Sequence, residues 1–145
     1  MGAYVDSSVL VKLYVTEPNS HVADALVRRL SAPIPLTHIQ ELEIRNAVRL
    51  KQGRGELTAA EAQAALGDFQ SDIGAGRYER PAYDLASTFD QAEILSQRYA
   101  AATNCRSLDL LHVAAAVKIG TREFVSFDAR QRAAAHAAGL VVLPI

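Results

Sequence analysis

Short apolar segments alternate with helix-forming segments along the whole chain, and this alternation is the feature that most constrains the fold. Strand candidates lie at Ala3–Val5, Glu123–Phe127 and Leu140–Leu143, with a weaker one at Tyr78–Tyr83. Helix-forming segments separate them. Strands that are separated by helices pair in parallel through crossover connections. The pattern therefore predicts an α/β fold with a central, mostly parallel sheet.

Capping signals mark where several helices are expected to begin. A capping box places a Ser or Thr three residues before a Glu or Gln, and three segments show this spacing: Thr37-His-Ile-Gln40, Thr58-Ala-Ala-Glu61 and Thr88-Phe-Asp-Gln91. Ser107 is expected to cap a further helix over Leu108–Ile119, which Gly120 would end.

The composition favours one domain spanning all 145 residues, of which half are hydrophobic. The formal net charge of -1 gives no support for nucleic-acid binding by bulk charge, so such binding would need local patches or metal ions. A single cysteine, Cys105, excludes an intrachain disulfide and fits a reducing compartment. With no basic leader and no apolar run of membrane-spanning length, the chain is expected to be cytoplasmic and away from membranes.

Two aspartates follow strand candidates in the same way. Asp6 comes directly after Ala3–Val5, and Asp128 comes directly after Glu123–Phe127. If these strands are parallel, both acids lie at the edge of the sheet where open α/β folds carry their functional crevice. The alternative for each residue is a plain structural role as the N-cap of the next helix.

Two further acids lie on predicted helices. Glu43 shares a helix face with Ile39 and Leu50, so it is expected on the inward stripe, where a carboxylate must be paired, protonated or bound to a cation. A buried ion pair with an arginine stays open as its alternative role. Asp109 lies in the first turn of an almost wholly apolar helix, where the helix dipole alone would favour it.

Together, these four acids can form one site. Carboxylates that converge repel one another, so they remain ionised only beside a compensating cation. Oxygen ligands alone favour a hard ion, Mg²⁺ or Mn²⁺. Such a site can activate water and stabilise in-line displacement at a phosphodiester.

The segments around these acids resemble the motifs of PIN domains, particularly the VapC-type toxins. The resemblance covers essentially the whole chain in the expected order: YVDSSVLVKLY around Asp6, LEIRNAV around Glu43, LDLLHVAAA around Asp109, and FVSFD ending at Asp128. It implies a three-layer α/β/α sandwich that holds Mg²⁺ or Mn²⁺ in an acidic pocket. It also implies an endoribonuclease of a VapBC-type toxin–antitoxin pair, which forms a homodimer and is neutralised by a cognate antitoxin protein.

The resemblance assigns roles to residues. Asp6, Glu43 and Asp109 would be the principal metal ligands, with Asp128 as the fourth acid. The hydroxyls of Ser7 and Ser126 are expected to support these ligands. The sequence positions, apart from the resemblance, suggest two further roles. Arg106 and Arg130 lie nearest to the pocket in sequence and are expected to contact the RNA backbone. His112 is expected to be a packing residue, because no second His or Cys lies at a spacing suited to zinc.

Two other functions remain as alternatives. A phosphoacceptor signalling module also clusters aspartates at strand ends, but it needs a lysine at a late strand end, where this chain has Ser126 and Asp128. A catalytically inactive PIN-like binding module would be favoured by a metal titration that shows no binding.

We expect a short upstream reading frame that encodes a DNA-binding antitoxin and overlaps this gene, because a toxin nuclease must be produced together with its inhibitor. Sequencing of the locus checks this, and an isolated gene with no such neighbour would count against the toxin assignment.

Overall fold

The computed structural model describes residues 2–31 and 33–145. Their contacts divide the chain into two compact units. The first unit comprises Met1–Asp6 and Pro81–Ile145, and the second comprises Ser7–Arg80. Each unit contains its own parallel strand pairing.

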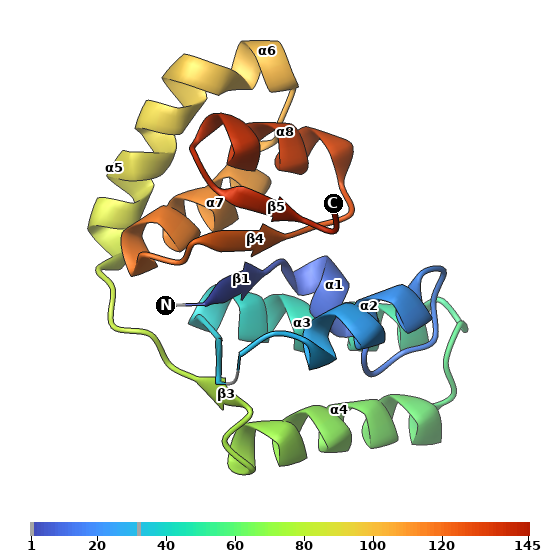
Figure 1. The fold of residues 1–145 in the computed structure, drawn as a ribbon. Coiled ribbons are helices and arrows are strands. Elements are labelled where there is room, and N and C mark those ends of the chain that lie inside the picture. Colours follow the sequence, from blue (N-terminus) through green and yellow to red (C-terminus); the bar gives the residue numbers. More distant parts are fainter. Residues whose placement is uncertain (1, 32) are drawn as a thin grey trace. The chain divides into compact units, whose positions relative to one another are not determined.

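A three-stranded parallel sheet organises the first unit (Figure 1). Its order is β1 (Ala3–Val5), β4 (Glu123–Val125) and β5 (Val141–Leu143), so β4 is central. Tyr4 lies opposite Phe124 on the neighbouring strand. The expectation that the first strand and the Glu123 strand run parallel is confirmed, and the two strands are direct neighbours.

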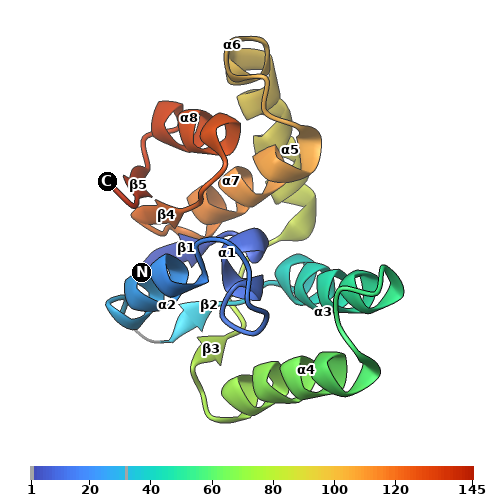
Figure 2. The ribbon, with the colours of Figure 1, turned by 90° about the vertical axis from the view of Figure 1, so that its right-hand side faces the viewer.

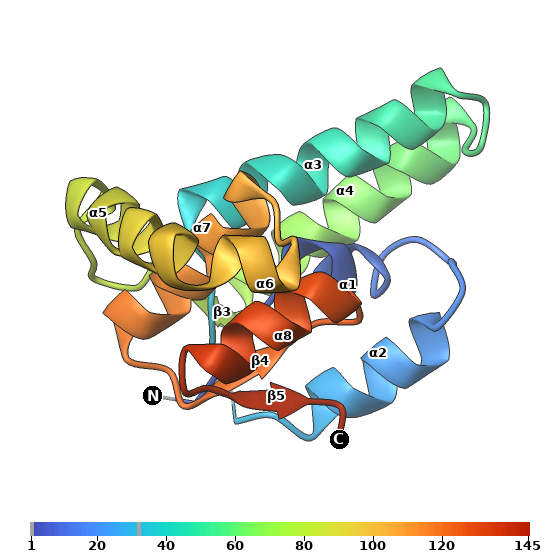
Figure 3. The ribbon, with the colours of Figure 1, turned by 90° about the horizontal axis from the view of Figure 1, so that it is seen from above.

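Helices of the first unit pack on this sheet and on one another. They are α5 (Leu85–Leu95), the π-helical segment η1 (Ser96–Ala100), α6 (Ala101–Thr103), α7 (Ser107–Ile119) and α8 (Ala129–Ala137). The first three form one continuous helical stretch (Figure 3). Helix α7 packs against α5 and α8, and α8 also packs against β5.

The core of the first unit lies between the sheet and α7. The rings of Tyr4 and Phe124 stack with centroids 5.6 Å apart, and both side chains are fully buried. Every residue of α7 from Leu110 to Ala116 is buried. A helix that is apolar on nearly all sides must be enclosed by neighbours, and α7 is enclosed along these residues.

The second unit is mainly helical. Its elements are α1 (Ser7–Val11), α2 (Ser20–Arg28), β2 (Ile34–Pro35), α3 (His38–Gly53), α4 (Ala59–Gly74) and β3 (Tyr78–Glu79). Strands β2 and β3 pair in parallel. Helices α3 and α4 lie side by side (Figures 2 and 3), and α3 also packs against α1.

Two of the three predicted capping boxes are confirmed. The hydroxyls of Thr37 and Thr58 each accept a hydrogen bond from the backbone N–H of the residue three positions later. The side chains of those residues, Gln40 and Glu61, accept in turn from the backbone N–H of the threonine. The box predicted at Thr88 is wrong. Helix α5 already begins at Leu85, because the Asp84 carboxylate accepts from the Ser87 backbone N–H and caps the helix one turn earlier.

The capping role predicted for Ser107 is wrong. Helix α7 begins at Ser107 itself, Arg106 holds the N-cap position, and no side chain caps it. At the other end, Gly120 ends the helix with φ of 85°, a left-handed conformation that glycine adopts without strain. In the described residues, no helix is long and apolar enough to cross a membrane.

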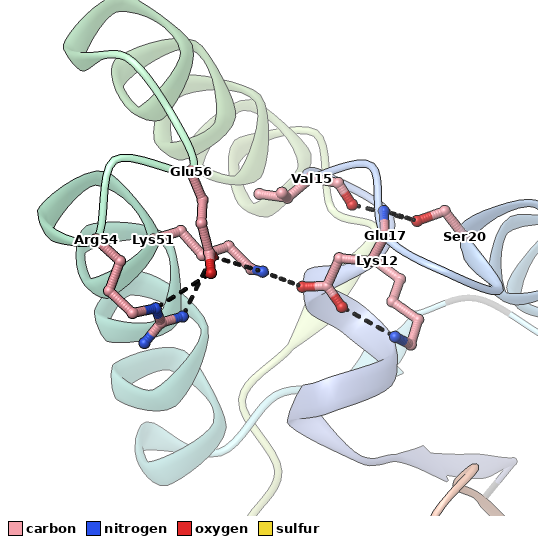
Figure 4. Close-up of polar contacts among 7 residues, drawn as sticks. All are labelled: Lys12, Val15, Glu17, Ser20, Lys51, Arg54 and Glu56. Atoms are coloured by element: carbon pink, nitrogen blue, oxygen red, sulfur yellow. Dashed lines mark hydrogen bonds and ion pairs between the residues drawn. The ribbon is translucent and has the colours of Figure 1, made fainter.

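An ion-pair network joins distant segments of the second unit (Figure 4). The Glu17 carboxylate accepts hydrogen bonds from Lys12 and Lys51, each with an N–O distance of 2.9 Å. The three side chains are only 15–18% exposed. Burial raises the pKa of Glu17, but the hydrogen bonds and charges of the two lysines outweigh it and hold the pKa below the ordinary value.

The Glu17→Gln variant is therefore expected to lower the free energy of unfolding by about 1 kcal/mol at neutral pH. A carboxylate whose folded pKa is depressed stabilises the protein above its ordinary pKa of 4.5 and loses this effect as pH falls through the folded pKa. Urea unfolding should show that the difference in the free energy of unfolding between variant and parent is smaller at about pH 3 than at neutral pH. Asp24→Asn, which removes an exposed ion pair with Arg28 on α2, is the control and should change stability by less than about 0.5 kcal/mol.

Candidate active site

Three of the four predicted acids lie in the first unit, near the carboxyl ends of its strands. Asp6 directly follows β1, and its backbone N–H donates to the Val125 carbonyl at 3.0 Å, which continues the pairing with β4. Its side chain is 6% exposed. Asp109 lies in the first turn of α7 and is half-buried, and Asp128 precedes α8.

One glutamine connects the three acid-bearing segments. The Gln131 side-chain amide donates to Asp6 Oδ1 at 3.0 Å and to the Asp109 carbonyl at 3.3 Å. Its oxygen accepts from the Ser126 hydroxyl at 2.6 Å, and Ser126 in turn accepts from the Asp128 backbone N–H at 3.1 Å. Ser126 is thus connected to Asp6 through Gln131, and its role in supporting metal ligands stays a prediction.

Gln131 was missed by reasoning from the sequence. The available signal was its position three residues after Asp128, where a glutamine normally returns a hydrogen bond to the N-cap backbone. In the structure its side chain instead reaches Asp6, 125 positions away in sequence. Only the tertiary structure could reveal that partner.

Asp109 lies within electrostatic reach of the other two acids of the first unit. Burial raises the pKa of Asp109, and the negative charges of Asp6 and Asp128 raise it further, against the opposing effects of His112 and Arg106. The same three acids help burial to raise the pKa of the nearby Cys105 thiol to about 11. The electrostatic potential at this end of the first unit is thus negative, because of Asp6, Asp109 and Asp128.

Asp128 has the structural role that was left open for it. Its Oδ1 accepts from the backbone N–H groups of Arg130 and Gln131, at 2.8 and 3.0 Å, and so caps α8. No hydrogen bond from a described residue reaches its Oδ2. Capping therefore uses one oxygen of an exposed carboxylate and leaves the other for a further role.

Arg106 and Arg130, the predicted RNA contacts, are both exposed. Arg106 is close enough to lower the pKa of Asp109, and Arg130 lies in the first turn of α8. Within residues 2–31 and 33–145, neither arginine forms an ion pair. Their role in binding RNA stays a prediction.

His112 behaves as the packing residue that was expected. It is 2% exposed, and its Nδ1 lies 2.7 Å from the Tyr4 hydroxyl. This hydrogen bond ties β1 to α7, the two elements that carry Asp6 and Asp109.

Glu43 belongs to the second unit and is half-buried on α3. Its Oε1 accepts from the Ser7 hydroxyl at 3.0 Å, so two of the predicted site residues meet there. The predicted buried face of α3 is wrong. Its buried residues are Gln40, Ile44 and Val48, whereas Leu50, which was expected to be buried, is 51% exposed. Glu43 lies at the margin of the buried face, and its convergence with Asp6 stays a prediction.

The donor chemistry at the first unit's acids is that of carboxylate oxygens. Among the residues that the structure describes, no three His, Cys, Asp or Glu side chains are grouped so as to hold a metal ion by themselves. Mg²⁺ usually keeps several waters and binds proteins through one or two carboxylates. Carboxylate oxygens are thus the donor type that suits such an ion.

Comparison with known proteins gives a consistent picture. Models of protein families give no match. The chain is 31% identical over 144 residues to Ribonuclease VapC45 of Mycobacterium tuberculosis (strain CDC 1551 / Oshkosh), covering 97% of this chain and 94% of that protein. Ribonuclease VapC49 of strain ATCC 25618 / H37Rv has the same identity and coverage.

The fold is also found among solved structures. The crystal structure of FitAcB from Neisseria gonorrhoeae matches with a TM-score of 0.67 and 19% sequence identity, covering 98% of this chain and 96% of that one. The predicted α/β fold, a parallel sheet flanked by helices, is thus confirmed. With the sequence similarity over nearly its full length, the chain belongs to the PIN-domain family and, within it, to the VapC-type toxin ribonucleases.

The two roles of Asp128 can be separated by mutation. Asp128→Ala removes the N-cap and is expected to lower the free energy of unfolding by about 1 kcal/mol, whereas Asp128→Asn keeps a strong capping residue and should cost little. If Asp128 also assists catalysis, Asp128→Asn will impair RNA cleavage at nearly unchanged stability. Urea unfolding and a cleavage assay measure the two effects, and an Asn variant with full activity would leave Asp128 as a cap alone.

Proposed function

We propose that the chain is the Mg²⁺- or Mn²⁺-dependent endoribonuclease toxin of a VapBC-type toxin–antitoxin pair, which hydrolyses RNA phosphodiester bonds. The observation that carries the proposal is the hydrogen-bonded linkage of three acid-bearing segments: Gln131 donates to Asp6 Oδ1 and to the Asp109 carbonyl through its side chain, and to Asp128 Oδ1 through its backbone. The charges of Asp6 and Asp128 also help burial to raise the pKa of Asp109. Like charges that are held together in this way are stabilised by a cation. The two relatives named as ribonucleases support the reaction class.

In this proposal Asp6 and Asp109 hold the divalent ion, and Asp128 assists through its uncapped oxygen. Glu43 keeps the same role as a prediction from the family motif, with Ser7 as its hydrogen-bond donor. When bound, the ion would supply Lewis-acid activation and charge neutralisation for phosphodiester hydrolysis. The carboxylates bind and orient it, and half-burial of Asp109 strengthens its electrostatic interactions.

RNA binding would depend on local positive charge, because the chain as a whole carries a net charge of -1. Exposed Arg106 and Arg130 flank the acids on α7 and α8, where their guanidinium groups can bind phosphates of the RNA backbone. Arg106 adjoins Asp109 closely enough to influence its pKa. These two arginines would hold the negatively charged substrate near negatively charged ligands.

The family also supports the proposed partners. We infer a cognate antitoxin protein that neutralises the nuclease, a homodimer, and one PIN-like domain over residues 1–145. A nuclease that acts on cellular RNA would work in the cytoplasm, where the single Cys105 would remain reduced.

The proposed function is tested by Asp6→Asn and Asp109→Asn. Each substitution removes a ligand charge, and each is expected to reduce Mn²⁺ affinity and RNA cleavage by more than about 100-fold, because even the partners of metal ligands are worth about 10–100-fold. Growth arrest on expression should be lost as well. Calorimetric Mn²⁺ titration, a cleavage assay and circular dichroism measure affinity, activity and folding.

Asp90→Asn is the matched control, since Asp90 is an exposed aspartate on α5 of the same unit. It should bind Mn²⁺ and cleave RNA like the parent. A fully active Asp6→Asn protein would refute the assigned site. A parent protein that folds but binds neither Mg²⁺ nor Mn²⁺ would favour the inactive binding module instead.

A further inference from the structure

We propose that Gln131 is the positioning residue of the acidic site: its buried side-chain amide sets the orientation of the Asp6 carboxylate and ties it to the first turn of α7. The inference rests on the proposed function, in which Asp6 and Asp109 hold a divalent ion.

The hydrogen bonds of this amide are fully used. Gln131 is 1% exposed. Its nitrogen has two N–H groups, and the structure gives it two acceptors, Asp6 Oδ1 at 3.0 Å and the Asp109 carbonyl at 3.3 Å. Both acceptors are oxygens that carry no proton when Asp6 is ionised, so the amide cannot rotate by 180° without placing its oxygen against theirs.

The opposite end of the amide is oriented by Ser126, which is fully buried. The Ser126 oxygen accepts from the Asp128 backbone N–H at 3.1 Å, and its hydroxyl hydrogen is donated to Gln131 Oε1 at 2.6 Å. The donors therefore point in one direction, from Asp128 through Ser126 and Gln131 to Asp6. Such chains of hydrogen bonds polarise and strengthen one another in a buried environment.

The backbone of Gln131 is also anchored. Its N–H donates to Asp128 Oδ1 at 3.0 Å as part of the α8 cap. Gln131 is thus held by Asp128 through its backbone N–H, and it holds Asp6 through its side-chain amide. Loss of the amide would remove the hydrogen bonds that hold both the Asp6 carboxylate and the first turn of α7.

A neutral amide suits this task better than a cation. An arginine or lysine beside Asp6 would orient the carboxylate but would also cancel the charge that a divalent ion requires. An amide donor fixes the carboxylate and leaves its charge in place. Partners of this kind commonly hold metal ligands in orientation.

The test is Mn²⁺ titration of the full chain carrying Gln131→Met, which keeps most of the volume and removes the donors. Mn²⁺ affinity should fall by about 10–100-fold. Val113→Ala, which removes buried methyl groups from α7 without changing a polar contact, is the control for stability. It should lower the thermal midpoint and leave Mn²⁺ affinity unchanged.

Ser126→Ala is the second variant, in case Gln131→Met does not fold. It retains Gln131 and removes only the hydroxyl that orients it, so a smaller loss of Mn²⁺ affinity is expected. Mn²⁺ affinity within about threefold of the parent in the folded variants would overturn the proposal, because the partners of metal ligands are worth about 10–100-fold.

A metal-free readout separates this inference from the proposed function. The side-chain NH₂ resonances of Gln131 should shift in the Asp6→Ala protein and remain in place in the Asp90→Ala protein. Unshifted Gln131 resonances in Asp6→Ala would overturn the positioning role. A parent that binds no Mn²⁺ but shows this shift would instead refute the metal site while retaining the hydrogen bond.

Discussion

The parallel pairing of β1 with β4 is the interaction on which the candidate site depends. Because the two strands run in the same direction and in register, their carboxyl ends lie together, and the residues that follow them share one edge. Asp6 continues the ladder through its backbone, and Asp128 caps the helix that follows β4. The pairing of three residues on each strand thus places Asp6 and Asp128, which are 122 positions apart in the sequence, after the same ends of neighbouring strands.

Placing acids close together disfavours their charged forms, but it also creates the negative charge that attracts a cation. Burial and like charge raise the pKa of Asp109, so the charged form of this carboxylate is disfavoured where it lies. The protein offsets part of this with directed N–H groups: Gln131 donates to Asp6, and the α8 backbone donates to Asp128. Neutral donors of this kind steady the carboxylates and preserve the negative charge that attracts a cation. The same groups therefore serve folding and the proposed chemistry.

Local signals predicted the elements well where short-range chemistry decides them. The capping boxes at Thr37 and Thr58 need only residues three apart, and both are present. The signal at Thr88 failed because Asp84, one turn earlier, is an equally good cap and extends α5 at its start. The predicted buried face of α3 was wrong for a different reason. Helix α3 packs against both α1 and α4, and its buried residues include Ile44 and Val48, whereas Leu50 is exposed. Periodicity alone does not show which face of a helix its neighbours cover.

The sequence by itself determined the α/β class, the parallel direction of the strands that begin at Ala3 and Glu123, and the positions of Asp6 and Asp128 after those strands. Each of these follows from neighbouring residues and from the rule of parallel pairing. Tertiary structure alone decided that Gln131 reaches Asp6 and that His112 bonds to Tyr4. Those contacts depend on how α7 and α8 pack against the sheet, and the direction of a side chain across such packing has no periodic signature. Distant partners are selected by three-dimensional fit, which a linear pattern does not contain.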